Sequence, residues 1–315
     1  MRLFVLRRVA QAAVVLLGVS LIVFLLTLLV PGDPIRTSLG TRFDPETYAA
    51  LRERAGFDQP LPVQYLSYVG GALTGDLGVS FRTGQPVSLA LVDRLPATLS
   101  LALCGLLVAL CIAVPLGVVS AMRSGSWADH VATVVSQVGV SIPEFWMAIL
   151  LILVLSGSLG FLPPSGYVPL SEDPVGWASH MVMPAVTIGL VSGAILTRFI
   201  RAAVLESLGQ DHVRTARSKG LREGLVLRRH VLRNALIPII TITGVQLASL
   251  LGGVIVVEVI FAWPGLGRLT LDAVRARDYP VVQGAVLLVA ALFLLVNLIV
   301  DLLYAAVDPR IRYSR

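Results

Sequence analysis

The sequence contains few charged residues. Only 14% of its 315 residues are Asp, Glu, Lys or Arg, against about 25% in a typical soluble domain. Hydrophobic residues make up 56%, and the mean hydropathy is +0.84. A water-soluble fold of this length would need more polar residues to cover its surface. The composition therefore predicts an integral membrane protein and excludes a cytosolic or secreted enzyme, a DNA-binding domain and a fibrous protein.

Lysine, cysteine and histidine are also scarce. Lys219 is the single lysine among 25 basic residues, and no Gly-x-x-x-x-Gly-Lys-Ser/Thr sequence surrounds it to hold a nucleotide phosphate. Cys104 and Cys111 lie in one apolar run and are expected to be packing residues. The four histidines lie far apart, with no cysteine at metal-ligand spacing, and the motifs of common hydrolases do not occur. We therefore expect no nucleotide, metal or other cofactor bound by this chain.

Long apolar runs are what the sequence has in abundance. A helix needs about 20 apolar residues to cross about 30 Å of hydrocarbon, and continuous runs favour helices over the alternating strands of a barrel. The first run is too long for a signal-peptide core, so we expect it to be retained as a membrane anchor. Pro115 and Pro143 should kink the second and third runs. The six predicted spans are 9–30, 97–120, 131–158, 181–204, 236–262 and 281–307.

The positions of the basic residues predict the orientation. They cluster near the N-terminus, in segment 205–235 and in the tail 309–315, and six spans place all three on one side, the cytoplasm. Loop 31–96 then lies outside, with turn sequences and a short amphipathic helix at about 45–55. The expected organisation is an N-terminal end and first span over 1–30, the outer loop 31–96, a five-helix core over 97–308 and the tail 309–315.

The fifth predicted span carries small residues at regular spacing. Gly244, Ala248 and Gly252 recur every four residues, and Ser249 lies one step around the helix. This spacing suits close helix packing, and it equally suits the lining of a translocation path with Gln246 as a polar contact. The spacing does not decide between the two interpretations.

Ionisable residues inside the predicted spans are few. Glu144, Glu258 and Asp301 all lie away from the middle of a span, whereas carriers driven by an ion gradient usually hold their coupling ions near the midplane. Glu258 is the best candidate for such a role, although helix capping or an interhelical hydrogen bond explains it better. A channel would need a repeated filter motif, and none occurs.

Segment 205–235 has two interpretations on charge alone. It holds seven basic residues against three acidic ones, so it could lie on anionic lipid headgroups or dock a partner. The basic residues are Arg214, Arg217, Lys219, Arg222, Arg228, Arg229 and Arg233.

Several short motifs together resemble one family, the permease subunits of bacterial ATP-binding-cassette importers. The resemblance is to the first-permease, B-type subunits of the dipeptide, oligopeptide and nickel branch. Each motif is weak alone, but their order and spacing cover essentially the whole chain. They are Pro31-Gly32-Asp33-Pro34, Gly75-Asp76-Leu77-Gly78, Ser141-Ile142-Pro143, Val213 to Leu221, Arg233-Asn234-Ala235, Glu258 to Gly267, Arg277-Asp278-Tyr279-Pro280 and Asp308-Pro309-Arg310.

The resemblance implies a type I importer bundle of six helices with both termini in the cytoplasm, in the bacterial cytoplasmic membrane. It implies a non-catalytic subunit that moves di- or oligopeptides by alternating access. ATP and magnesium would be bound by two separate ATP-binding subunits, alike or different. A second, homologous permease and an extracytoplasmic substrate-binding protein or lipoprotein would complete the assembly, with no nucleic acid.

The same resemblance makes the cytoplasmic loop the element that docks on the ATP-binding subunits. The family's Glu-Ala-Ala-x-x-x-Gly pattern falls on Arg214, Thr215, Ala216 and Gly220, so its first two positions differ here. The implied coupling residues are Arg214, Thr215, Ala216, Arg217, Lys219, Gly220 and Leu221. An ion-gradient-driven carrier and a membrane scaffold are the alternatives, and ATP-dependent uptake together with co-purifying ATP-binding subunits would separate all three.

Overall fold

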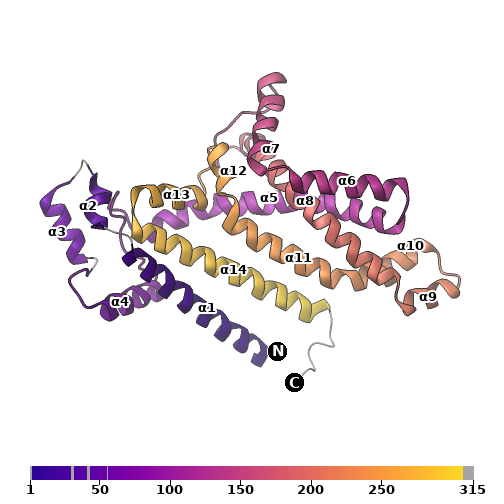
Figure 1. Ribbon diagram of the computed structural model, residues 1–315, viewed down its shortest axis with the longest axis horizontal. Coiled ribbons are helices and arrows are strands. Elements are labelled where there is room, and N and C mark those ends of the chain that lie inside the picture. The colour runs from indigo at the N-terminus through magenta and orange to yellow at the C-terminus, as the bar shows by residue number, and fades with distance from the viewer. Residues whose placement is uncertain (1, 30–31, 41–42, 55, 308–315) are drawn as a thin grey trace. The chain divides into compact units, whose positions relative to one another are not determined.

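The computed structural model describes residues 2–29, 32–40, 43–54 and 56–307 (Figure 1). The predicted tail 309–315 and the motif at 308–310 lie outside the described residues. Within the described ranges the secondary structure is helical, with one isolated antiparallel bridge between Val79 and Pro86. This agrees with the predicted all-α fold. Five helices are long and apolar enough to cross a membrane, and a bent pair makes a sixth span if it is counted as one.

The chain divides into two compact units. The first comprises 1–98 and 264–295, and the second comprises 99–263 and 296–315. Helices α5 (Val87–Met122) and α14 (Tyr279–Val307) contribute residues to both. The other helices of the first unit are α1 (Arg2–Leu29), α2 (Pro34–Leu39), α3 (Pro45–Arg54), α4 (Leu61–Thr74) and α13 (Leu266–Ala276).

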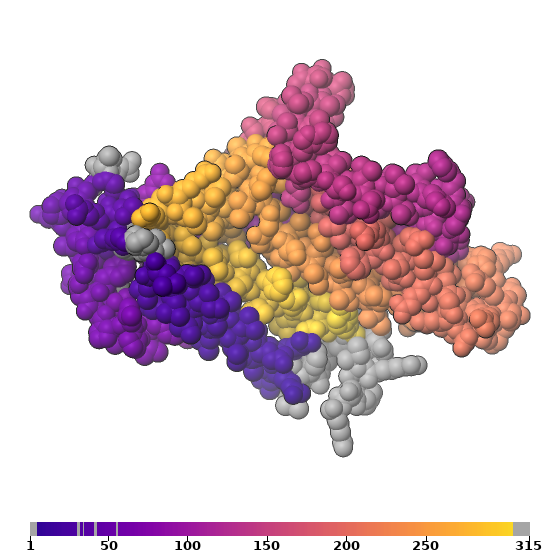
Figure 2. Space-filling model, in the orientation of Figure 1, coloured from indigo at the N-terminus to yellow at the C-terminus, as the bar shows by residue number. Residues whose placement is uncertain are grey.

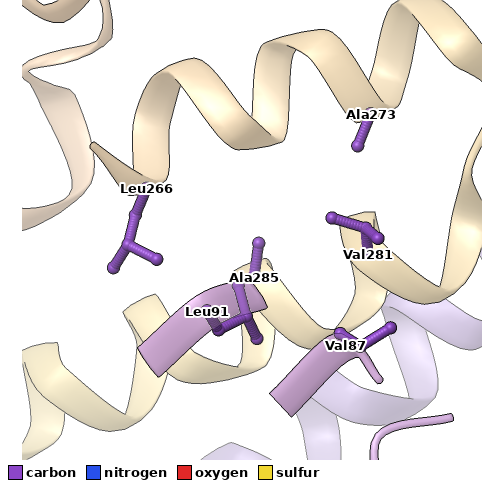
Figure 3. Packing of buried hydrophobic residues seen from close by; sticks show 6 residues of the cluster. All are labelled: Val87, Leu91, Leu266, Ala273, Val281 and Ala285. Atoms are coloured by element: carbon purple, nitrogen blue, oxygen red, sulfur yellow. The ribbon is translucent and has the colours of Figure 1, made fainter. Parts of the chain in front are cut away.

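The first unit joins the predicted outer loop to the starts of α5 and α14. Val87 and Leu91 of α5 pack against Leu266 of α13 and Val281 and Ala285 of α14 (Figure 3). All five side chains are at most 4% exposed. Because this burial favours helix before the apolar run begins, α5 starts ten residues earlier than the predicted span 97–120. It also remains helical through Pro115.

The second unit is built around α8 (Pro174–Leu208), which packs against α6 (Trp127–Ser141) and α11 (Leu232–Gly253). Figure 1 shows α8 between these two helices. The remaining elements are α7 (Glu144–Leu151), a π-helical segment at Ile152–Ser158, α9 (Asp211–Ser218), α10 (Glu223–Val226), a second π-helical segment at Leu227–Val231 and α12 (Ile255–Ile260).

Two predicted spans differ from single straight helices. The span predicted at 131–158 consists of α6 and then α7 with its π-helical extension, and the two parts are bent by 98°. Pro143 caps α7 at this bend, where the sequence predicts only a kink. The span predicted at 236–262 crosses a break at Val254, between α11 and α12. The helix before that break instead extends back to Glu223, through much of segment 205–235.

Candidate functional site

The implied coupling residues lie on α9 and the turn that follows it. Arg214, Thr215, Arg217 and Lys219 are exposed, whereas Val213 and Ala216 on the opposite face are 0% and 4% exposed. Figure 2 shows the α9–α10 segment, in salmon, at the surface of the molecule. The short helix therefore presents a basic face outward while its apolar face anchors it.

The turn after α9 has a defined geometry. Gly220 adopts φ +74°, in the left-handed region that favours glycine, and its amide donates to Arg217 O at 2.9 Å. Arg217 spans the turn to Glu223, with Nε to Oε1 at 2.9 Å and Nη2 to Oε2 at 3.2 Å. Leu221, the last of the implied coupling residues, is half-buried. These contacts fix the direction in which the chain leaves α9.

Two further contacts tie this segment to the membrane helices. Ser207 Oγ, near the end of α8, donates to Val231 O at 3.0 Å. On the far side, Asn234 Nδ2 lies 2.7 Å from His212 Nε2. The π-helical segment before α11 is thus held to α8, and the start of α9 is held to α11.

The small residues of the predicted fifth span separate into two groups. Gly244 and Ala248 are buried, and a Cβ added at Gly244 would collide with Val300 of α14. Ser249 and Gly252 are exposed. Gln246 Nε2 donates to Ser192 Oγ of α8 at 2.9 Å, so this amide serves an interhelical contact.

The exposed group is part of a longer face of α11. Asn234, Pro238, Thr241, Val245, Ser249 and Gly252 are exposed at intervals of three or four residues, the spacing of one helix face. Bulky apolar residues dominate other exposed surfaces, such as Leu6, Val14 and Leu29 of α1. The exposed face of α11 instead consists mostly of small and polar residues, with Val245, at 45% exposure, as its large apolar side chain.

Glu258 lies apart from the exposed face of α11. It belongs to α12, beyond the break at Val254, and is 0% exposed. Its backbone oxygen accepts a hydrogen bond from Trp263 N at 2.8 Å. Trp263 is also fully buried and stacks edge-on against Tyr167, with ring centroids 4.7 Å apart. These residues form a packed corner of the second unit.

Sequence reasoning missed two polar contacts, of which the first is partly buried and the second is buried. Asp129 of α6 pairs with Arg201 of α8, and Asp278 accepts hydrogen bonds from Ser80 Oγ and Phe81 N. An arginine inside an apolar span is a signal that could have drawn attention to Arg201. Asp278 belongs to a motif quoted for the resemblance, but its partners lie almost 200 positions away in the sequence.

The described part of the chain contains no group of three or more His, Cys, Asp or Glu residues that could hold a metal ion. The absence of a cofactor in this chain stays a prediction.

Comparison with known proteins covers nearly the whole chain. Residues 113–313 match the family described as binding-protein-dependent transport system inner membrane component. Residues 1–102 match the N-terminal domain of membrane components of the same transport systems.

Two relatives show the extent of the similarity. A protein of Brucella abortus strain 2308, named as a peptide transport system permease, is 44% identical over 314 residues and 100% of both chains. The dipeptide transport system permease protein DppB of Escherichia coli K12 is 41% identical over 336 residues and 99% of both chains.

Solved structures share the fold at lower identity. An inward-facing MetNI methionine ABC transporter chain is 19% identical, with a TM-score of 0.57, covering 70% of this chain and 97% of that one. A chain of an amino acid ABC transporter solved with histidines is 18% identical, with a TM-score of 0.50, covering 71% and 94%.

Proposed function

Because the chain belongs to the family of inner membrane components of binding-protein-dependent transport systems, we propose that it is the permease subunit of an ATP-binding-cassette importer for di- and oligopeptides. Membership confirms the family predicted from the motifs, and it gives the ion-gradient carrier no support. The observation that carries the substrate class is the 41% identity to a dipeptide permease over the full chain. The chain is a multi-pass protein of the inner membrane.

In this proposal the chain is a non-catalytic subunit of a larger complex. Two ATP-binding subunits hydrolyse ATP, a second permease completes the path, and an extracytoplasmic binding protein delivers the peptide. Both termini and α9 face the cytoplasm, and segment 31–96 faces the binding protein. The positive-inside distribution of Arg and Lys supports this orientation.

We assign the coupling role to α9 and the turn at Gly220. The exposed side chains of Arg214, Arg217 and Lys219 can meet an acidic groove, while buried Val213 and Ala216 hold the helix to its own chain. A short helix held in this way transmits movement of the ATP-binding subunits as a rigid body, which is what alternating access requires.

We assign a path-lining role to the exposed face of α11, with Thr241, Val245, Ser249 and Gly252 along its middle. Apart from Val245, these side chains are small or polar, which suits water and a peptide better than lipid tails. Buried Gly244 and Ala248 then serve helix packing, and Gln246 serves its contact with Ser192.

The first experiment tests the function. The assembled complex, reconstituted in vesicles with its binding protein, should take up labelled dipeptide when ATP is enclosed on the cytoplasmic side. Uptake driven by a proton gradient without ATP, by this chain alone, would contradict the proposal and favour the secondary carrier.

The second experiment tests the coupling segment with a matched pair. Ala216→Asp places a carboxylate on the buried face of α9 and should abolish uptake while the chain remains in the membrane. Ser218→Asp makes the same addition at an exposed position of the same helix, and its uptake should stay much closer to that of the wild type. Equal uptake by both variants would defeat the assignment.

The third experiment tests the path. In a background with Cys104 and Cys111 replaced by alanine, Ser249→Cys should react with a water-soluble thiol reagent. Leu107→Cys is the control, because Leu107 is 62% exposed on an apolar helix and should stay unreactive among lipid tails. An unreactive Ser249→Cys would remove Ser249 from the path.

A further inference from the structure

A partly buried ion pair, between buried Asp129 and half-buried Arg201, joins two helices near the start of the coupling segment. Asp129, at the start of α6, is 5% exposed. Arg201 Nε lies 2.7 Å from Asp129 Oδ1, and Arg201 Nη2 lies 2.8 Å from Oδ2. We propose that this pair makes α5, α6 and α8 a single rigid lever that carries α9, so that Asp129 and Arg201 are positioning residues for coupling. The inference rests on the proposed function.

The pair belongs to a network that includes the turn between α5 and α6. Ser120 Oγ, near the end of α5, donates to Asp129 Oδ1 and lies 3.0 Å from Arg201 Nε. The amide of Gly125, in the turn, donates to Asp129 Oδ2 at 2.9 Å. Bidentate arginine–carboxylate pairs fix both distance and angle. Three helices are therefore held in one orientation at this point.

A seam of close contacts continues from the ion pair along the same helices. A Cβ added at Gly117 of α5 would lie 2.8 Å from Ile200 Cγ2 of α8, and one at Gly105 would lie 2.7 Å from Ile188 Cγ2. On α6, a Cβ at Gly139 would lie 2.8 Å from Ala194 Cβ. These backbones are too close for ordinary side chains, which is typical of tight helix packing in membranes.

The order of these contacts places the ion pair near α9. Positions on α8 rise with positions on α5, so the two helices run parallel and their C-terminal ends lie together. Arg201 lies about two turns before the end of α8 at Leu208. Helix α9 begins at Asp211. A force on the exposed face of α9 is therefore transmitted to α8 next to the Asp129–Arg201 pair. Through that pair it reaches α5 and α6.

The Asp129–Arg201 pair can be removed without changing the exposed face of α9. Arg201→Gln and Asp129→Asn remove one charge each, and Arg201→Lys keeps the charge but loses the planar fork. Arg198→Gln is the matched control, because Arg198 lies three residues earlier on α8 and is exposed. Each variant is purified as the whole complex and reconstituted with a peptide-loaded binding protein.

In Arg201→Gln and Asp129→Asn, stimulation of ATP hydrolysis by the loaded binding protein should fall by about tenfold. Basal hydrolysis and subunit stoichiometry should be unchanged, which a general loss of folding would not give. Arg201→Lys should be intermediate, and Arg198→Gln should match the wild type. Full stimulation in both Arg201→Gln and Asp129→Asn would overturn the proposal.

A second measurement keeps the ion pair intact and remains informative if the variants fail to assemble. Spin labels at Val134→Cys on α6 and Ser218→Cys on α9 replace exposed side chains, in a background with Cys104 and Cys111 changed to alanine. Their separation should be the same in nucleotide-free and ATP-trapped complexes. A separation that changes with nucleotide would refute the rigid lever, whereas a wild-type complex without peptide uptake would refute the proposed function instead.

Discussion

Replacing Asp278 should loosen the outer segment from the turn between α13 and α14. Asp278 is 3% exposed and accepts hydrogen bonds from Ser80 Oγ and, at 3.0 Å, from Phe81 N. Ser80 and Phe81 are themselves buried, at 3% and 4% exposure. Asp278→Ala leaves a hydroxyl and an amide without this acceptor where little water reaches them, which is the most costly way to lose hydrogen bonds.

The size of the effect follows from the two bonds. A hydrogen bond to a charged group contributes about 1.5–3 kcal/mol, so losing two of them in Asp278→Ala should cost the first unit about 3–6 kcal/mol. Ser80→Ala removes one donor and should cost about 1.5 kcal/mol. Because the two variants delete the same contact, the double variant should be more stable than the sum predicts by about 1 kcal/mol.

Trypsin cleavage at Arg82 is a direct assay, because this exposed arginine follows Phe81 in the same turn. When opening is fast relative to cleavage, the rate follows the opened population. A tenfold change corresponds to about 1.4 kcal/mol. Cleavage should therefore rise about a hundredfold or more in Asp278→Ala and about tenfold in Ser80→Ala. Gln85→Ala, an exposed change in the same turn, is the control and should have little effect.

Two results would contradict this reasoning. Cleavage of Asp278→Ala at the wild-type rate would mean that the carboxylate does not hold the outer segment. Strictly additive effects of Ser80→Ala and Asp278→Ala would mean that the two side chains do not act on each other.

Three other sites give predictions of their own. Trp263→Ala should cost about 3–5 kcal/mol, because the fully buried ring packs edge-on against Tyr167; an unchanged thermal midpoint of the purified complex would contradict this. Gly117→Leu should reduce the yield of monodisperse protein on size-exclusion chromatography, since a Cβ there would lie 2.8 Å from a side-chain carbon of α8. Gly18→Leu is the control and should not reduce it, because a Cβ at Gly18 would have no atom within 4 Å. Partial burial raises the pKa of Asp33, but hydrogen bonds from a tyrosine hydroxyl and two backbone amides outweigh it and lower the pKa below 3.8. The cap that the Asp33 carboxylate forms on α2 should therefore be intact above pH 3.8 and should weaken as the pH falls through the lowered pKa. Hydrogen exchange of α2 should show this loss in the wild type but not in Asp33→Asn.

The membrane-spanning helices were largely predictable from the sequence, because crossing hydrocarbon demands long apolar runs. Whether an apolar run forms one straight helix could not be predicted. Hydropathy reports that 131–158 is apolar, and Pro143 marks a break, but neither determines a bend of 98°. The early start of α5 was also unpredictable, because Val87 and Leu91 become helical through burial against α13 and α14, which are distant in the sequence.

The candidate site was predictable where its signal is local. The turn after α9 needs a residue that tolerates positive φ, and Gly220 supplies it with φ +74°. The Asp129–Arg201 pair was missed because its members are 72 positions apart. Arg201 lies near the end of one predicted span, with Arg198 three residues before it, and Asp129 lies just before another. The local pattern does not distinguish a lipid-headgroup contact from an internal ion pair.

The two interpretations of the small residues in α11 illustrate why burial has to decide. Lipid tails are as apolar as leucine, so membrane helices associate through close backbone approach and polar contacts. A buried small residue such as Gly244 is explained by that packing, because Val300 occupies the space that a Cβ would need. An exposed small residue such as Ser249 gains nothing from packing within its own chain. The same periodic pattern therefore has two physical causes on one helix, and the exposed half is the part that a translocation path explains.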